Sequence, residues 1–380
     1  MTAIPYIILG CLLLLLYCAE RRAATLRVRR MVQCVAYLTL FIFVGLRGHL
    51  YSDFINYYPY FEDVPPLSRL TLRALSHFSF EAGFTLYTSA IKSLCDNYFF
   101  WVATGVAIDV VVLRSTFRRY CSSEVLPLLL FIAFQGLFIE FNLYRNVKAL
   151  DLFLLSLPAL QHRRIVPYVA LNLVGAMFHL SSLVYLPLYF VLHRSMPKWM
   201  MWCGIVFANV VVVARLPVME WLLGGVDAVA LAEVAERVGA HARAGGGGYL
   251  LSVGHLERTL SIVLFTLLYA RMVAQRASNA MFYNLLWLYY LSFMLCYEVR
   301  VLADRIPMLF VAGYWVLYAN VVELRFRLRQ WVVAIVVGLS FLKLYLSNDI
   351  APARYDNLLF GIESYAKRRA TMLRFLDDER

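Results

Sequence analysis

Residues 4–30 read IPYIILGCLLLLLYCA followed by ERRAATLRVRR. The first part is an apolar run long enough for a transmembrane helix, and the second part carries five arginines. A secretory signal peptide has its positive flank before the apolar run, whereas here the arginines come after it. The order therefore predicts a retained membrane helix whose N terminus lies outside the cytoplasm.

Similar apolar runs recur along almost the whole chain. Of its 380 residues 62% are hydrophobic and 16% are charged, and the mean hydropathy is +0.68. A soluble domain cannot bury that much apolar surface. The composition predicts an all-α polytopic integral membrane protein with about twelve transmembrane helices, at residues 4–19, 31–46, 98–114, 124–142, 147–160, 165–179, 181–193, 199–215, 256–271, 281–298, 306–323 and 331–347.

The turns between these runs alternate in charge. If residues 20–30 are cytoplasmic, every other turn is also cytoplasmic, and each of those short turns is basic. Topology therefore accounts for the net charge of +12, and no basic surface domain is left to bind nucleic acid. The seven cysteines form no CxxC or Cys/His pattern, so neither a disulfide framework nor a metal site is expected.

We interpret residues 1–380 as a single transmembrane domain. Outer segments 47–97, 216–255 and 347–380 are expected to form an outer cap of short helices and loops. Phe80, Phe84, Tyr87, Ile91 and Leu94 have helical spacing, which predicts an amphipathic helix against the outer face. Residues 226–238 also have helical spacing, and the four glycines at 245–248 are typical of a hinge.

Arginines at the outer turns oppose the positive-inside rule and need a reason. Several converging guanidinium groups would hold a pyrophosphate without a metal, although each could instead pair with a neighbouring acid or reach water. We expect Arg145 and Arg305 to bind it, with Arg47 as a further candidate. The remaining predicted substrate-binding residues are Tyr57, Arg258 and Arg300.

Some residues expected on the outer side could act as a general base. The carboxylates Asp53, Glu81 and Glu257 are equally open, His179 could be a base or a hydrogen-bond partner, and spacing alone does not choose among them. Lys148 and Asp151 are three residues apart, which predicts a structural pair. Asp109 lies toward the inner end of its helix, so we expect it on the side opposite the arginines, in at most a supporting role.

Five motifs in order resemble one family: LRGHLYSDFINYY (46–58), FEAGF (80–84), NLYRNVKAL (142–150), FHLSSLVYLPLY (178–189) and ADRIPMLF (303–310). They resemble the EpsG-like branch of the Wzy-type polysaccharide polymerases, which are related to O-antigen polymerases and ligases. The chain departs from the family pattern at three places. The glycine usual before the aspartate is replaced by Tyr51 or Ser52, Asn146 stands where a glutamine is usual, and Asp304 stands where an arginine is usual.

The resemblance implies a glycosyltransferase of the bacterial inner membrane with its site facing the periplasm. For its reaction His179 and Glu81 are our candidates for the general base, and Asp53 is a further catalytic candidate that could orient Arg47 or the substrate. Such an enzyme joins oligosaccharide repeats of O-antigen, capsule or exopolysaccharide that undecaprenyl pyrophosphate carries as donor and acceptor. It would need no nucleotide sugar, metal or other cofactor, and its partners would be membrane lipids and a chain-length regulator. The alternatives are a flippase for the same lipid-linked oligosaccharide, a ligase of the same broad fold and a non-catalytic assembly partner.

Overall fold

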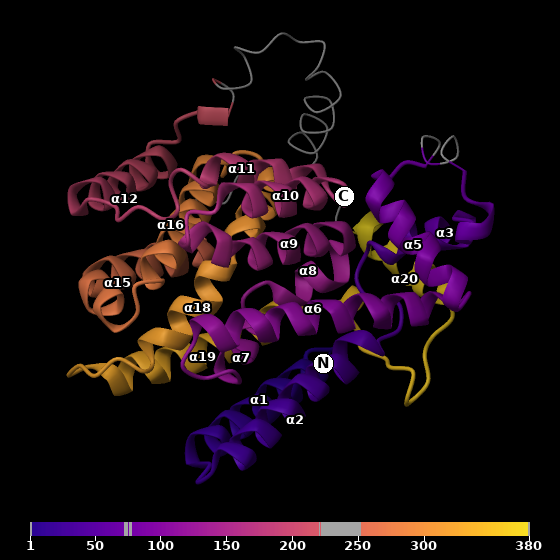
Figure 1. The fold of residues 1–380 in the computed structure, drawn as a ribbon, viewed down its shortest axis with the longest axis horizontal. Coiled ribbons are helices and arrows are strands. Elements are labelled where there is room, and N and C mark those ends of the chain that lie inside the picture. Colours follow the sequence, from indigo (N-terminus) through magenta and orange to yellow (C-terminus); the bar gives the residue numbers. More distant parts are fainter. Residues whose placement is uncertain (1, 72–74, 76–77, 220, 222–251, 379–380) are drawn as a thin grey trace. The chain divides into compact units, whose positions relative to one another are not determined.

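The computed structural model describes residues 2–71, 75, 78–219, 221 and 252–378, and their regular structure is helical (Figure 1). The longer helices are α1 (Ile4–Arg22), α2 (Leu26–Gly45), α3 (Phe54–Asp63), α5 (Ala82–Leu94), α6 (Tyr98–Tyr120), α7 (Leu126–Ala133), α8 (Gly136–Asn142), α9 (Tyr144–Gln161), α10 (Ile165–Ala176), α12 (Lys198–Val213), α15 (Val253–Gln275), α16 (Asn279–Leu295), α18 (Ala312–Val321), α19 (Arg329–Asn348) and α20 (Tyr365–Asp378). The short ones are η1 (Leu67–Arg69), η2 (Leu180–Val184), α11 (Tyr185–Leu188), α17 (Arg300–Arg305), η3 (Pro307–Phe310) and η4 (Ala351–Ala353). The predicted all-α class is confirmed.

Four helices in the described part of the chain are long and apolar enough to cross a membrane, namely α1, α2, α6 and α19. Helices α10 and α12 are apolar but shorter. The chain is thus built as a membrane protein, while the count of twelve spans and the cap stay predictions.

Three of the predicted spans are interrupted. The span 124–142 divides into α7 and α8 at Gln135, whose φ of 67° lies in the left-handed region. The span 181–193 consists of η2 and the single turn α11, and the span 306–323 consists of η3 and α18. Periodicity does not reveal such breaks, because the residues on both sides remain apolar.

The chain divides into two compact units. One contains the residues up to Val191 together with those from Tyr318, and the other contains Leu192–Leu317. In the second unit α12, α15 and α16 pack together, with hydrogen bonds from Asn209 to Tyr290 (2.6 Å) and between Thr266 and Tyr283 (2.6 Å). The prediction of a single domain stays a prediction.

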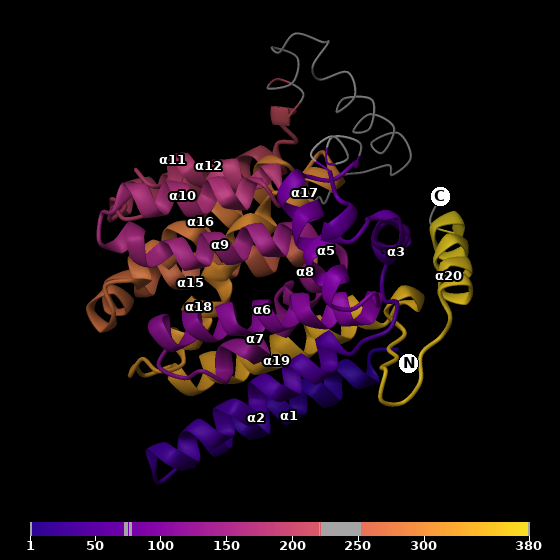
Figure 2. The same cartoon turned by 45° about the vertical axis from the view of Figure 1, so that its right-hand side comes forward.

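The first unit has two chemically different ends. Its helices α6, α9 and α10 run side by side (Figures 1 and 2). At one end, Thr2 hydrogen bonds with Asp349 (2.9 Å) and Tyr51 with Asn348 (2.8 Å), which gathers the segments predicted to lie outside. At the other end Arg21 pairs with Glu323, among the turns predicted to be cytoplasmic. The segments predicted to lie outside and the turns predicted to be cytoplasmic are thus at different ends of the first unit. The orientation of this unit across the membrane stays a prediction.

Two predicted features lie outside the described residues, namely the helical spacing at 226–238 and the glycine hinge at 245–248.

The predicted amphipathic helix is present as α5, but its faces differ from the expectation. Phe84 and Ile91 are buried, Leu94 is 80% exposed, and Phe80 precedes the helix.

Candidate functional site

An ion pair between Arg145 and Glu81 lies at the end of the first unit that contains the N terminus. Glu81 is the N-cap residue of α5, where the helix dipole favours a negative charge. Arg145 is the second residue of α9, where the dipole disfavours a cation. Contacts offset that cost, because the guanidinium lies 4.1 Å from the centre of the Phe80 ring and also donates to the Tyr57 hydroxyl (3.4 Å). The predicted Arg145 thus has an acidic partner 64 residues away in sequence.

His179 belongs to the same cluster, through Glu81. It is the N-cap residue of η2, and the next backbone N–H, that of Leu180, donates to Glu81 Oε1 (3.3 Å). The Ser181 backbone N–H donates to His179 Nδ1 (3.2 Å), and the Ser181 hydroxyl lies 2.7 Å from the same nitrogen. Because Nδ1 accepts a hydrogen bond, a neutral His179 carries its proton on Nε2.

Gly83 brings the two halves of this cluster together. Phe84 N–H donates to the Met177 carbonyl (3.2 Å), two residues before His179. A Cβ on Gly83 would lie 2.6 Å from the Met177 Cβ and 2.7 Å from its carbonyl oxygen. Only glycine therefore allows the start of α5 to approach the His179 turn this closely.

Tyr57 and Asp53 come from the segment before and within α3. Tyr57 stacks on Tyr144 with ring centres 4.5 Å apart, is 4% exposed, and has its phenol pKa raised by burial. One face of its ring is thus occupied by protein. Asn142 accepts hydrogen bonds from the backbone N–H groups of Ser52 (3.1 Å) and Asp53 (3.4 Å), which ties this segment to α8.

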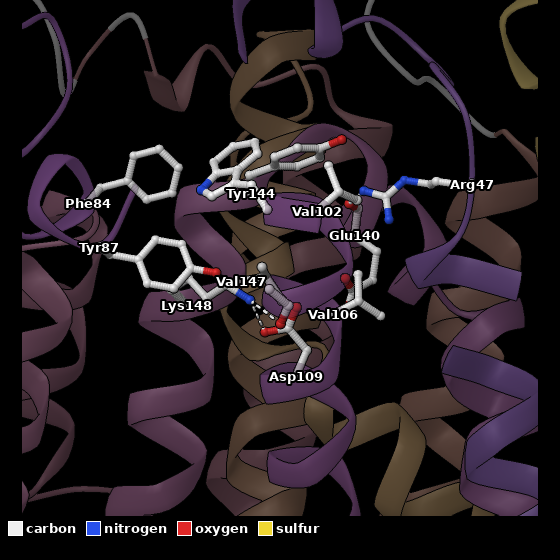
Figure 3. A pocket seen from close by; sticks show the side chains of 12 residues that line it. Arg47, Phe84, Tyr87, Val102, Val106, Asp109, Glu140, Tyr144, Val147 and Lys148 are labelled. Atoms are coloured by element: carbon white, nitrogen blue, oxygen red, sulfur yellow. Dashed lines mark hydrogen bonds and ion pairs between the residues drawn. The ribbon is translucent and has the colours of Figure 1, made fainter. Parts of the chain in front are cut away.

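Arg47 lines a cavity whose empty space, open solvent at its mouth included, is about 290 Å³ (Figure 3). Its guanidinium is buried and donates to the carbonyls of Val44 (2.5 Å) and Glu140 (2.7 Å). It lies 5.2 Å from the centre of the Tyr144 ring. Arg47 and Arg145 are therefore linked through the stacked tyrosines 144 and 57, and the hydrogen bonds of the Arg47 guanidinium go to carbonyls rather than to Asp53.

Two expectations about buried charges were wrong. Asp109 lines the same cavity as Arg47, so it is not on the opposite side from the cluster. Lys148 pairs with Asp109 on α6, not with Asp151 on its own helix, and donates to the Gly105 carbonyl (2.7 Å). Spacing along one helix favoured the pair Lys148–Asp151. It could not indicate Asp109, because that residue is on another helix and lies 39 residues away in sequence.

The C-terminal residues 351–376, here called the strap, pack on the segment that contains Arg47. Gly48 N–H donates to the Asp356 carbonyl (3.1 Å), and Leu358 N–H donates to the Leu46 carbonyl (2.8 Å). A Cβ on Gly48 would lie 2.2 Å from Asp356 Oδ1, so any larger residue at position 48 would have to displace the Asp356 carboxyl group. No pattern in the sequence pointed to this pairing.

The strap is also tied down by rings and charges. Tyr365 stacks on Tyr58 at 4.5 Å and donates to the Ile55 carbonyl (3.3 Å), which Pro59 leaves without its helical N–H partner. Buried Arg368 pairs with Asp356 (2.9 Å) and Glu363 (3.0 Å). Charged groups around Glu363, first of all Lys367, lower the pKa of its carboxyl.

The remaining predicted residues belong to the second unit. Arg258 is buried in α15, donates to the Gly254 carbonyl (2.9 Å) and to the Tyr289 hydroxyl (3.2 Å), and lies 3.8 Å from the centre of the Phe293 ring. Glu257, beside it, accepts from the Ser261 hydroxyl (3.1 Å). Arg300 and Arg305 are the first and last residues of α17, and Arg305 is exposed. Their convergence with Arg145 on one substrate stays a prediction.

Among the described residues, no group of three or more His, Cys, Asp and Glu side chains is arranged to hold a metal ion.

Comparison of the chain with known protein families gives a match. The model of the EpsG family matches residues 30–356, which is most of the chain and includes the five motifs. No curated protein and no solved structure matches it. Together with the apolar helices and the ordered motifs, this match shows that the chain belongs to the EpsG family.

Proposed function

We propose that this protein is a membrane glycosyltransferase that polymerises oligosaccharide repeats carried on undecaprenyl pyrophosphate, at the periplasmic face of the bacterial inner membrane. Family membership supports the polymerase class. The observation that carries the proposal is the cluster of Arg145, Glu81 and His179 at one end of the first unit. The cluster combines a guanidinium that can bind a pyrophosphate, a carboxylate that can accept a proton and an imidazole that can donate a hydrogen bond.

In the proposed reaction, a hydroxyl oxygen of the acceptor sugar attacks the anomeric carbon of the donor. The bond from that carbon to the pyrophosphate oxygen breaks, and undecaprenyl pyrophosphate leaves with the bonding electron pair. Glu81 accepts the proton of the attacking hydroxyl. Arg145 stabilises the charge that develops on the leaving pyrophosphate.

The ion pair suggests how the base is activated. In the structure the Glu81 carboxylate is occupied by the Arg145 guanidinium. A pyrophosphate offers Arg145 more charge and a bidentate geometry, so the donor displaces Glu81 from the guanidinium. The carboxylate is then free to act as the base only once the donor is in place.

We assign the remaining residues to supporting roles. His179 donates from Nε2 to the substrate, since Nδ1 already accepts from Ser181. Tyr57 holds Arg145, and Asp53 contacts the sugar or its hydroxyl groups near the start of α3. Arg47 supports Tyr144 from inside the cavity.

The test uses cells that lack the gene, complemented with wild type, Arg145→Ala or Glu81→Gln, and a gel of the surface polysaccharide. We expect a single-repeat product in the deletion and in both variants, and a ladder with wild type. Arg354→Ala is the matched control, since this arginine of the strap has a 67% exposed side chain. Loss of even the single repeat in the deletion would point to the flippase instead.

Purified protein gives the second measurement. Lost base and charge-stabilising groups typically cost about 10²- to 10⁴-fold in rate. Glu81→Gln should lower kcat by that order but also lower the KM for the lipid-linked donor, because the neutral amide competes less for Arg145 than the carboxylate does. An unchanged kcat in Glu81→Gln would refute its role as the base.

A further inference from the structure

A cluster of buried charges lies below the candidate site and is not used by the proposed reaction. Asp109 of α6, Glu140 of α8, and Lys148 and Asp151 of α9 are all at most 8% exposed, and Arg47 lies in the same cavity as three of them. Asp109 pairs with Lys148, while Glu140 and Asp151 are buried close to this pair. Three carboxyl groups and two cations thus lie near one another.

Such a cluster is an expensive way to hold helices together. Removing charges from water costs several kcal/mol per ion, and apolar side chains of similar volume often stabilise a fold at least as well. Ionisable groups inside membrane proteins generally have a function, most reliably that of fixing a register or a site. We therefore ask which helices this cluster holds in position.

The cluster holds α6 and α9 at a fixed contact. Lys148 Nζ binds both Asp109 and the Gly105 carbonyl (2.7 Å), one helical turn apart on α6. A Cβ on Gly105 would lie 3.1 Å from Tyr87 Oη and 3.4 Å from Lys148 Nζ, so the glycine leaves room for this approach. Sliding α9 by one turn, about 5.4 Å, would leave Lys148 without its partners.

Arg145 is three residues before Lys148 and therefore projects from a neighbouring position on the same side of α9. Tyr144, four residues before Lys148, lines the same cavity and stacks on Tyr57. Figure 3 shows Tyr144 above and the Lys148–Asp109 pair below it in this cavity. Any rotation or shift of α9 at Lys148 thus moves Tyr144 and Arg145 together.

We propose that Lys148 is a positioning residue for Arg145: with Asp109 it fixes the first turns of α9 so that the Arg145 guanidinium meets the donor pyrophosphate. This inference rests on the proposed function, because it assigns Lys148 a role through the residue that binds the leaving group.

The experiment compares full-length Lys148→Met, Asp109→Asn and the double variant. Lys148→Met leaves Asp109 without its cation, and Asp109→Asn leaves Lys148 without its ion-pair partner, so each single change should lower the amount of folded protein. The double variant removes both charges of the pair and should restore folded protein, measured as the monodisperse fraction and its thermal midpoint. With a purified lipid-linked repeat as substrate, its kcat should remain at least tenfold below wild type, with a smaller change in KM.

A double-mutant cycle shows whether Lys148 acts through Arg145. Arg145→Lys keeps the charge but loses the bidentate fork. In that background the Lys148→Met/Asp109→Asn change should cost much less than in wild type. Lys92→Met is the matched control, because Lys92 is equally buried (8%) but binds the carbonyls of Phe61 and Glu62 (both 2.8 Å), away from α9.

Wild-type kcat in the double variant, or losses that multiply in the Arg145→Lys background, would overturn the positioning role. Failure of the proposed function is seen separately, since Arg145→Ala would then retain a full polymer ladder, and the positioning role would fall with it. If Arg145→Ala abolishes the ladder and the double variant is fully active, only the role of Lys148 is refuted.

Discussion

His49 gives a prediction whose size follows from its surroundings. It is 3% exposed and lies between the rings of Phe54, Tyr58, Tyr98, Phe99 and Tyr365, at centre-to-centre distances of 5.2 to 5.6 Å. Its Nδ1 is buried without a partner. Burial lowers the pKa of this imidazole from 6.5 to about 4, partly opposed by Asp356 and assisted by Arg368.

The folded protein therefore keeps His49 neutral down to about pH 4, whereas the unfolded chain binds its proton near pH 6.5. Between these values the unfolded state holds more protons, so the free energy of unfolding falls as the pH falls. One pKa unit corresponds to about 1.4 kcal/mol, which gives a total loss of about 3 kcal/mol by pH 4. The loss begins near pH 6.5 and levels off below pH 4.

The assay measures unfolding of the purified protein in mixed micelles at a series of pH values, for wild type and His49→Phe. The phenyl ring fills the aromatic site but takes up no proton, so the variant should lose about 3 kcal/mol less than wild type between pH 7 and pH 4. His162→Phe, at an exposed position, is the control. Equal pH profiles for wild type and His49→Phe, or NMR titration of His49 near pH 6.5, would refute the reasoning.

Three further predictions concern the site and the strap. Gly83→Ala should lower the free energy of unfolding by about 1–3 kcal/mol and reduce the amount of polymer, because the new Cβ would clash with Met177. Gly338→Ala is the control and should do neither, since nothing lies within 4 Å of its Cβ; thermal midpoints of the two variants test this. His179→Gln should keep more activity than His179→Asn, since only Gln places a donor near the Nε2 position; equal rates in the transfer assay would count against the tautomer. Arg368→Met should cost about 3 kcal/mol by leaving its buried carboxylate partners unpaired, and limited proteolysis should then cleave the strap; wild-type resistance would contradict this.

The sequence predicts the all-α membrane class because membrane constraints act locally. Apolar runs long enough to span predicted the positions of α1, α2, α6 and α19, which are long and apolar enough to cross a membrane. The breaks are harder to predict. Gln135 adopts a left-handed conformation that a glycine would have signalled, yet the sequence places a glutamine there and the glycine after it.

The candidate site was predicted residue by residue but not as a set of contacts. Arg145, Glu81 and His179 were each identified by type and position, and the structure joins them. Their pairing spans 64 residues, and the Lys148–Asp109 pair spans 39. Spacing rules on one helix relate residues three or four apart, so they favoured Lys148 with Asp151, and tertiary contact overrode them.

The energetics of α9 identify its start as functional without any motif. Arg145 places a cation at the positive end of a helix dipole, which costs about 0.3–1 kcal/mol before its contacts are counted. One turn later, Lys148 places a second cation where it is almost completely buried. Natural sequences usually avoid such local conflicts and retain them where function requires them. Two unfavourable cations on neighbouring turns, each held by an acid from a different helix, are therefore best explained by a demand for one fixed guanidinium position.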